Sequence, residues 1–330
     1  MDISIIIPVY RSAHTLGTLL QRLCAVLDRT GLGYEIVFVE DGSPDDSWRV
    51  LNELQAAYPK RIIAIQLMRN YGQHNALMCG FRHSRGEFVI TLDDDLQNPP
   101  EEIPKLIAAI QEQDLDLVYG SYGSKKHSGW RNLGSTVINA FYRAVFDASV
   151  TVTSFRIIRR ELLESIFSYN LNFTYLDGLL AWNTKRIGQV SVEHHPRLEG
   201  RSGYSLGKLL GLGLNLLVNF SLFPLQLVSA CGLLAAAGGF LLALYYLIEY
   251  LRSNISVPGY ASITIAILIV GGTQLLALGI IGEYLGRLHM NVNRKPQYMV
   301  RHVLGAPRWL RVPALEKAAE EAGVPAGGRF

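Results

Sequence analysis

Residues 87–97 read Glu87-Phe88-Val89-Ile90-Thr91-Leu92-Asp93-Asp94-Asp95-Leu96-Gln97, and they run on into Asn98-Pro99-Pro100. An apolar, β-prone segment therefore ends in three consecutive carboxylates. Like charges this close repel and raise one another's pKa. A hard divalent cation would relieve the repulsion, because it takes oxygen ligands from carboxylates, amides and bound phosphates. The alternative is a solvated acidic loop, and the position of the run in the chain decides between the two.

Short apolar segments alternate with amphipathic ones on both sides of this run. The pattern predicts strands at 3–8, 34–39, 62–67, 87–92 and 116–119, and helices near 14–29, 45–58, 72–84 and 99–113. Alternation of this kind is typical of βαβ units and a mostly parallel sheet. Right-handed crossovers place the carboxyl ends of the strands at one edge, where ligands bind. Polar clusters stand at four of these ends: Pro8-Val9-Tyr10, Glu40-Asp41-Gly42-Ser43, Arg69-Asn70-Tyr71-Gly72 and the acidic run.

The composition indicates that part of the chain contacts lipid. Hydrophobic residues make up 49% of the 330 residues and charged residues only 18%, with a mean hydropathy of +0.18. A net charge of +3 is too small to suggest nucleic acid as a partner, and no nucleic-acid-reading motif is present. Three scattered cysteines without CxxC spacing argue against a disulfide framework or a zinc site. The strand-like start predicts no cleaved signal peptide.

Two long apolar segments follow the α/β part. Phe223 to Tyr250 carries no charge before Glu249, and Ser262 to Leu285 carries none before Glu283. Each exceeds the roughly 20 residues that cross a bilayer core as a helix, so we predict two transmembrane helices. Basic residues flank their outer ends, whereas the linker at 251–261 holds only Arg252. The positive-inside rule then predicts a multi-pass protein of the cell membrane with both termini in the cytoplasm.

The predicted organisation has four parts. An α/β domain at 1–208 precedes an interfacial helix at 209–221, a two-helix transmembrane domain at 222–288 and a cytoplasmic tail at 289–330. The interfacial segment has few charges, and it could instead extend the first span. From Val312 onward we expect a short helix and a frayed end.

The four polar clusters, taken in order, resemble the signature blocks of family 2 glycosyltransferases with the GT-A fold. The blocks are Ile5-Ile6-Ile7-Pro8-Val9-Tyr10, Glu40-Asp41-Gly42-Ser43-Pro44-Asp45, Arg69-Asn70-Tyr71-Gly72-Gln73-His74 and Asp93 to Glu101. They are most similar to those of the polyprenyl-phosphate glycosyltransferases, such as dolichol-phosphate mannose synthase and the bacterial undecaprenyl-phosphate sugar transferases. Gly282 to Arg287 resembles the membrane part of the bacterial members. The resemblance covers about residues 1–300 and implies a Rossmann-like GT-A domain followed by two transmembrane helices.

The resemblance implies a nucleotide and metal site at the strand ends. The residues that would bind the nucleotide are Pro8, Val9, Tyr10, Val39, Asp41, Asp93 and Asp94. Those that would hold Mg²⁺ or Mn²⁺, which bridges the diphosphate, are Asp93, Asp95 and Gln97. Asp94, on the alternate side of the chain, is expected to touch ribose or donor sugar through its backbone. Asp41 could also cap the helix that follows it, and His74 is expected to be a polar residue that closes a loop onto a helix.

Basic residues further along would contact phosphate, because arginine's planar fork suits that group. The residues implied are Arg131, Arg197, Arg201, Ser202 and Lys208. Asp95, Arg131 and Asp177 are the predicted catalytic residues. Asp177 either faces the acceptor or caps a helix. A dedicated base is not required, because a phosphate monoester is already largely dianionic at neutral pH.

Some positions depart from the family pattern. Arg11-Ser12 stand where Asn-Glu is usual, Glu40 replaces a common Asp, and Gly203 stands where a Lys is frequent. Thr151 and Thr153 stand near a position where many relatives carry an Asp.

The predicted function is inverting, metal-dependent transfer of one sugar from a UDP- or GDP-linked donor to a polyprenyl phosphate. The partners are the nucleotide sugar, the lipid phosphate and the membrane, with homo-oligomers possible. Two alternatives stay open. A processive polysaccharide synthase usually needs a Q-x-x-R-W block and more membrane helices, neither of which the sequence contains. A catalytically silent sugar-nucleotide-binding scaffold would fit the departures at Ser12 and Gly203.

Overall fold

A computed structural model of the chain describes residues 1–122, 150–169, 175–195, 260–292 and 296–305, together with scattered positions between 228 and 252. The chain divides into two compact units. One comprises Met1–Ser202 with Pro296–Phe330, and the other comprises Gly203–Lys295.

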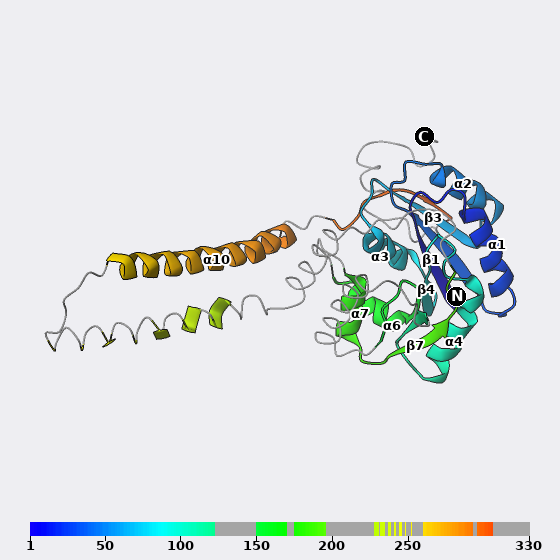
Figure 1. The fold of residues 1–330 in the computed structure, drawn as a ribbon. Coiled ribbons are helices and arrows are strands. Elements are labelled where there is room, and N and C mark those ends of the chain that lie inside the picture. The colour runs from blue at the N-terminus through cyan, green and yellow to red at the C-terminus, as the bar shows by residue number, and fades with distance from the viewer. Residues whose placement is uncertain are drawn as a thin grey trace. The chain divides into compact units, whose positions relative to one another are not determined.

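The first unit is built on one mixed sheet with helices on both faces (Figure 1). Within the part of the unit that the structure describes, eight strands lie in the order β7-β5-β6-β4-β1-β2-β3-β8. The bounds are β1 Ile3–Val9, β2 Tyr34–Glu40, β3 Ile62–Leu67, β4 Phe88–Thr91, β5 Leu117–Tyr122, β6 Arg156–Arg159, β7 Ile187–Val192 and β8 Val300–Leu304. All five predicted strands are present. β1 to β4 are parallel to their neighbours in this set, and β5 is parallel to β7, which confirms the mostly parallel, Rossmann-like architecture.

Two strands run against this direction. β6 lies between β4 and β5 and is antiparallel to both. β8 is antiparallel to β3 and extends the sheet at that edge, although 233 residues separate partners such as Met68 and Arg301. The sequence pattern predicts neither β7 nor β8, and the helix expected after Val312 lies outside the described residues.

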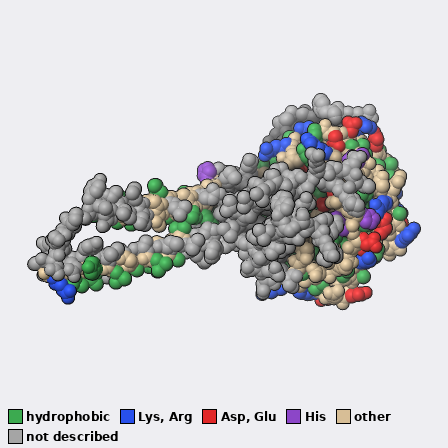
Figure 2. All heavy atoms as spheres, viewed as in Figure 1, with side chains coloured by type: hydrophobic (Ala, Val, Ile, Leu, Met, Phe, Trp, Pro, Cys, Tyr) green, Lys and Arg blue, Asp and Glu red, His purple; other side chains and the backbone are tan. Residues whose placement is uncertain are grey.

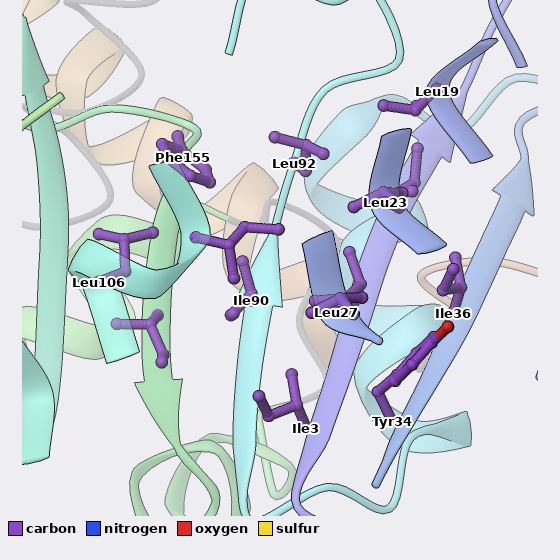
Figure 3. Packing of buried hydrophobic residues seen from close by; sticks show 14 of the residues in the cluster. Ile3, Leu19, Leu23, Leu27, Tyr34, Ile36, Ile90, Leu92, Leu106 and Phe155 are labelled. Atoms are coloured by element: carbon purple, nitrogen blue, oxygen red, sulfur yellow. The ribbon is translucent and has the colours of Figure 1, made fainter. Parts of the chain in front are cut away.

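Alternate residues of the strands face two different helical layers. Ile3, Ile5 and Ile7 belong to a core cluster with α1 (Leu16–Leu27), α2 (Ser47–Ala57) and α4 (Ile103–Glu112). Figure 3 shows Leu19, Leu23 and Leu27 of α1 pointing toward β1 and β2. This pattern follows from the period of two in a strand and of about 3.6 in a helix.

The opposite face of the sheet carries α3 (Gln73–His83), α6 (Arg160–Ile166) and α7 (Leu176–Asn183). α3 lies very close to β1, because a Cβ at Gly80 would fall 2.3 Å from Cγ2 of Ile6. This close approach packs the second half of α3 directly against β1 and β2, with Val39 of β2 also beside Gly80.

In the second unit the structure describes α10, Tyr260–Val292, which covers the second predicted span. Its exposed side chains include Ile263, Ile267, Leu275 and Leu278. Figure 2 shows hydrophobic side chains along the described part of this unit and side chains of both charges on the sheet unit. Within the described residues, no helix combines the length and hydropathy that crossing a membrane requires. Most of the first predicted span, and all of the predicted interfacial helix, lie outside those residues.

Candidate active site

A cavity of about 310 Å³ opens at the carboxyl ends of β1, β2 and β4. Its lining comes from each of the four polar clusters that the sequence places at strand ends. The lining residues are Pro8, Val9, Tyr10, Asp41, Asn70, Gly72, Gln73, Asp93, Asp94 and Asp95. The structure therefore brings together the predicted nucleotide-binding residues, with Val39 as the exception. Val39 is fully buried in β2, and Gly80 of α3 lies against it.

Asp41 holds the turn between β3 and α3. Its Oδ1 accepts from the backbone N–H of Tyr71 at 2.7 Å, and its Oδ2 accepts from that of Gly72 at 2.8 Å. Gly72 has φ +88°, a conformation that favours glycine. Burial raises the pKa of Asp41 to about 6, against the two backbone hydrogen bonds, which lower it. Asp41 does not cap the next helix: the N-cap of α2 is Asp46, which makes no side-chain cap hydrogen bond, and the neighbouring Asp45 Oδ1 accepts from Ser47 N and Oγ.

The end of β1 is tied to the acidic run. The backbone N–H of Tyr10 donates to Oδ2 of Asp94 at 3.1 Å. Burial raises the pKa of Asp94 to about 6, and hydrogen bonds from Ser12 and Tyr10 oppose this. Ser12, at one of the departures from the family pattern, is buried and helps to hold this loop. Tyr10 is 42% exposed and lines the cavity, so its ring offers a stacking surface there.

Asp93 and Asp95 have different surroundings. Asp93 Oδ1 accepts from Gln73 Nε2 at 2.8 Å, and Oδ2 accepts from the hydroxyl of Ser154. Asp95 Oδ1 accepts from the backbone N–H of Gln97 at 3.1 Å, a local turn. Leu96, between Asp95 and Gln97, has φ +60° and a buried side chain. A left-handed residue that is not glycine is uncommon and clusters at functional sites.

Gln97 lies beside the cavity rather than in its lining. Its carbonyl oxygen accepts from the N–H of His195 at 2.9 Å, which ties the acidic run to the segment after β7. Nearby, the hydroxyl of Tyr122 donates to Asn98 Oδ1 at 2.7 Å. These contacts hold Gln97 and Asn98, which follow the three aspartates after Leu96.

The donor set fits a divalent cation that completes its coordination with substrate. Among the described residues, no group of three His, Cys, Asp or Glu side chains forms a ready-made metal cage. Mg²⁺ is commonly bound by one or two carboxylates together with substrate phosphates and water, so such a cage is not needed. Asp93 and Asp95 both line the cavity and supply carboxylate oxygens of the required kind.

Asp177 lies outside the cavity lining, in a buried cluster. Its carboxylate forms an ion pair with Arg156 and accepts from the hydroxyl of Tyr119 at 2.8 Å. It stands in the first turn of α7, where the N-cap is Tyr175 and not Asp177. The ring of His74 packs edge-on against that of Tyr175, with 5.8 Å between the ring centroids. His74 therefore connects the start of α3 to the segment that begins α7.

The predicted phosphate-binding residues Arg131, Arg197, Arg201, Ser202 and Lys208 lie outside the described residues. Four site residues lacked a role in the sequence interpretation: Asn70, Gly72, Gln73 and Ser154. Asn70, Gly72 and Gln73 belong to a block that the sequence analysis recognised, so the block itself was the signal. Ser154 lies 61 residues after Asp93, just before β6, and no local sequence pattern links the two residues.

The model of the family "Glycosyl transferase family 2" matches residues 4–167. Curated proteins named undecaprenyl-phosphate 4-deoxy-4-formamido-L-arabinose transferase are similar over almost the whole chain. The protein from Edwardsiella ictaluri is 34% identical, with 92% of this chain and 94% of that protein covered. The one from Pseudomonas aeruginosa is 34% identical, with 96% and 94% covered.

Among solved structures, glucosyl-3-phosphoglycerate synthase from Mycobacterium tuberculosis in complex with Mn²⁺, uridine diphosphate and phosphoglyceric acid is 18% identical. It has a TM-score of 0.48, with 66% of this chain and 76% of that chain covered. The family model and the near-full-length similarity to the curated relatives agree with the α/β sheet and the strand-end cavity. The chain belongs to the family 2 glycosyltransferases.

Proposed function

We propose that the protein transfers one sugar from a nucleotide-diphosphate sugar to a polyprenyl phosphate of the undecaprenyl type, at the cytoplasmic face of the membrane. The observation that carries this proposal is the similarity to undecaprenyl-phosphate sugar transferases over more than nine tenths of both chains. A similarity of that extent includes the region after the sheet domain as well as the donor site.

The cavity supports the donor half of the proposal. Tyr10 and Asp41 would contact the base and ribose, at the ends of β1 and β2. The first turn of α3 presents Gly72 and Gln73 to the same cavity. The positive end of a helix dipole favours a negatively charged group such as a diphosphate.

Asp93 and Asp95, with Gln97 beside them, would hold Mg²⁺ or Mn²⁺. When bound, the cation neutralises charge on the leaving diphosphate. The protein's own part is positioning: the fixed carboxylates orient the donor so that its anomeric carbon is open to in-line attack by the acceptor phosphate. Attack from the face opposite the diphosphate inverts the configuration at that carbon. Arg131, Arg197, Arg201, Ser202 and Lys208 are proposed to contact the diphosphate and the lipid phosphate.

Membrane attachment is proposed for the region from Phe223 to Leu285. The two uncharged apolar runs in the sequence and the exposed apolar side chains of α10 support it. Fractionation of cells that produce the chain, followed by carbonate extraction of the membranes, tests this proposal. Release of the chain by carbonate would contradict two spanning helices.

Labelled nucleotide sugars incubated with membranes containing the protein test the transfer. One labelled sugar on a chloroform-soluble lipid is the expected product. A chelator, or Asp95→Ala, should abolish its formation, and retained transfer in either case would overturn the metal-dependent mechanism. A labelled polymer would instead indicate a processive synthase. Failure of a full panel of donors to label any product would indicate a silent binding protein.

A further inference from the structure

The carboxylate of Asp93 is held at both oxygens by residues distant in sequence. Gln73 Nε2 donates to Oδ1 at 2.8 Å, and the Ser154 hydroxyl donates to Oδ2. Gln73 lies 20 residues before Asp93 and Ser154 lies 61 residues after it. The two donors approach from different elements, so the carboxylate plane is defined by the fold rather than by its own loop.

The hydroxyl of Ser154 is fixed by the sheet. The carbonyl oxygen of Ser154 accepts from the hydroxyl of Thr91, the last residue of β4, and Thr91 is buried. Arg156, two residues further, pairs in register with Thr91. Ser154 is therefore held beside the start of the acidic run by the antiparallel pairing of β6 with β4.

Gln73 is fixed from the other side. It is the first residue of α3, directly after Gly72, whose N–H donates to Asp41. Its side chain is exposed, so its hydrogen bond competes with water more than that of Ser154 does. We therefore expect the hydrogen bond from Ser154 to contribute more than that from Gln73 to the orientation of the Asp93 carboxylate.

We propose that Gln73 and Ser154 are positioning residues that hold Asp93 in the orientation in which it binds the divalent cation. This inference rests on the metal site assigned under the proposed function. Hydrogen-bonding partners of ligating carboxylates orient them, and losing such a partner typically costs about 10-fold to 100-fold in metal affinity. A carboxylate already held in place also loses less side-chain freedom when the cation binds.

The test measures Mn²⁺ binding directly, with the full chain in detergent. Free Mn²⁺ is followed by electron paramagnetic resonance during titration, with and without UDP. For Ser154→Ala we expect affinity to fall by about 10-fold or more, and for Gln73→Ala by a smaller but measurable factor. Ser154→Thr, which keeps the hydroxyl, should recover most of the loss.

Two matched variants control for the loss of a side chain elsewhere. Ser165→Ala removes a hydroxyl that donates to Leu162 O on α6, and Gln111→Ala removes an exposed amide on α4. Both should bind Mn²⁺ as the unaltered chain does. If Ser154→Ala does not fold, Gln73→Ala decides the matter, because an exposed side chain can be removed without disturbing the core.

Asp95→Ala separates failure of this inference from failure of the metal site. Wild-type affinity in Gln73→Ala and Ser154→Ala, together with lost affinity in Asp95→Ala, would overturn the positioning role alone. Wild-type affinity in Asp95→Ala would overturn the metal site, and the positioning role with it.

Discussion

The guanidinium of Arg156 forms an ion pair with the carboxylate of Asp177, and the two side chains expose only 2% and 7% of their surface. Burial disfavours the charged form of Arg156, but Asp177 and Tyr119 outweigh it and hold the arginine pKa above its ordinary value. The pair joins β6 to α7. Because its carboxylate is engaged in this way, we expect Asp177 to position α7 rather than to act as a base.

Removing Arg156 alone should lower the stability of the fold strongly, whereas replacing Arg156, Asp177 and Tyr119 together should lower it much less. Arg156→Met leaves a buried carboxylate uncompensated and should lower the free energy of unfolding by about 3–5 kcal/mol. Adding Asp177→Leu and Tyr119→Phe removes the uncompensated carboxylate and the hydroxyl that donates to it, and should recover most of that loss. Urea unfolding of the full chain in detergent measures both. A triple variant no more stable than Arg156→Met would contradict this account.

The triple variant also tests the role of Asp177 in transfer. Loss of a general base typically costs about 10²–10⁴-fold in rate. A positioning role predicts a much smaller loss in a variant that folds normally. A stable triple variant whose kcat falls by the full factor, with an unchanged KM for the donor, would restore Asp177 to the catalytic residues.

Asp41 should make stability depend on pH in a recognisable direction. Burial holds the pKa of Asp41 at about 6 in the folded chain, above the ordinary value of 3.8, so the folded chain binds more protons than the unfolded chain in this interval. The contribution of Asp41 to stability therefore falls as pH rises through the interval. Relative to Asp41→Asn, the unaltered chain should gain in thermal midpoint as pH drops from about 7 to about 4. A constant difference between the two proteins would show that the carboxyl titrates normally.

Gly80 and Gly17 offer a matched pair of helix glycines. A Cβ at Gly80 would lie 2.3 Å from Ile6 Cγ2, whereas a Cβ at Gly17 meets nothing within 4 Å. Overpacking should make Gly80→Ala less stable by about 1–3 kcal/mol. Gly17→Ala should be neutral or stabilising by up to about 1 kcal/mol, because alanine favours a helix. Displacement of α3 also moves Gly72 and Gln73, so Gly80→Ala should raise the donor KM while Gly17→Ala leaves it unchanged.

Strand β8 should be required for a stable sheet domain. It pairs with β3, and the ring of His302 in β8 stacks on that of Trp48 in α2, with 6.2 Å between the ring centroids. A chain ending at Met299 lacks β8 alone and exposes the edge of β3, which should lower the thermal midpoint and promote aggregation. A chain ending at Gly305 keeps every pair of β8 and is the matched control. Equal midpoints for the two truncated chains would show that β8 is dispensable.

The five strands, their parallel connections and the edge at which the polar clusters meet can all be predicted from the sequence. These depend on hydrophobic periodicity over a few residues and on the handedness of βαβ units, both of which are local. The acidic run was recognisable as part of the site for the same reason, since it follows an apolar strand directly.

The partner of each polar side chain depends on the folded arrangement and could not be predicted from the sequence. Asp41 binds backbone groups 30 and 31 residues away, Asp94 binds Tyr10 across 84 residues, and Asp93 is held by Ser154 through a strand antiparallel to its neighbours. The sequence left Asp177 open between an acceptor-facing group and a helix cap; in the fold the N-cap of α7 is Tyr175, and Asp177 pairs with a buried arginine. Such choices follow from the cost of burying an unpaired charge or donor, which depends on what the whole fold brings alongside.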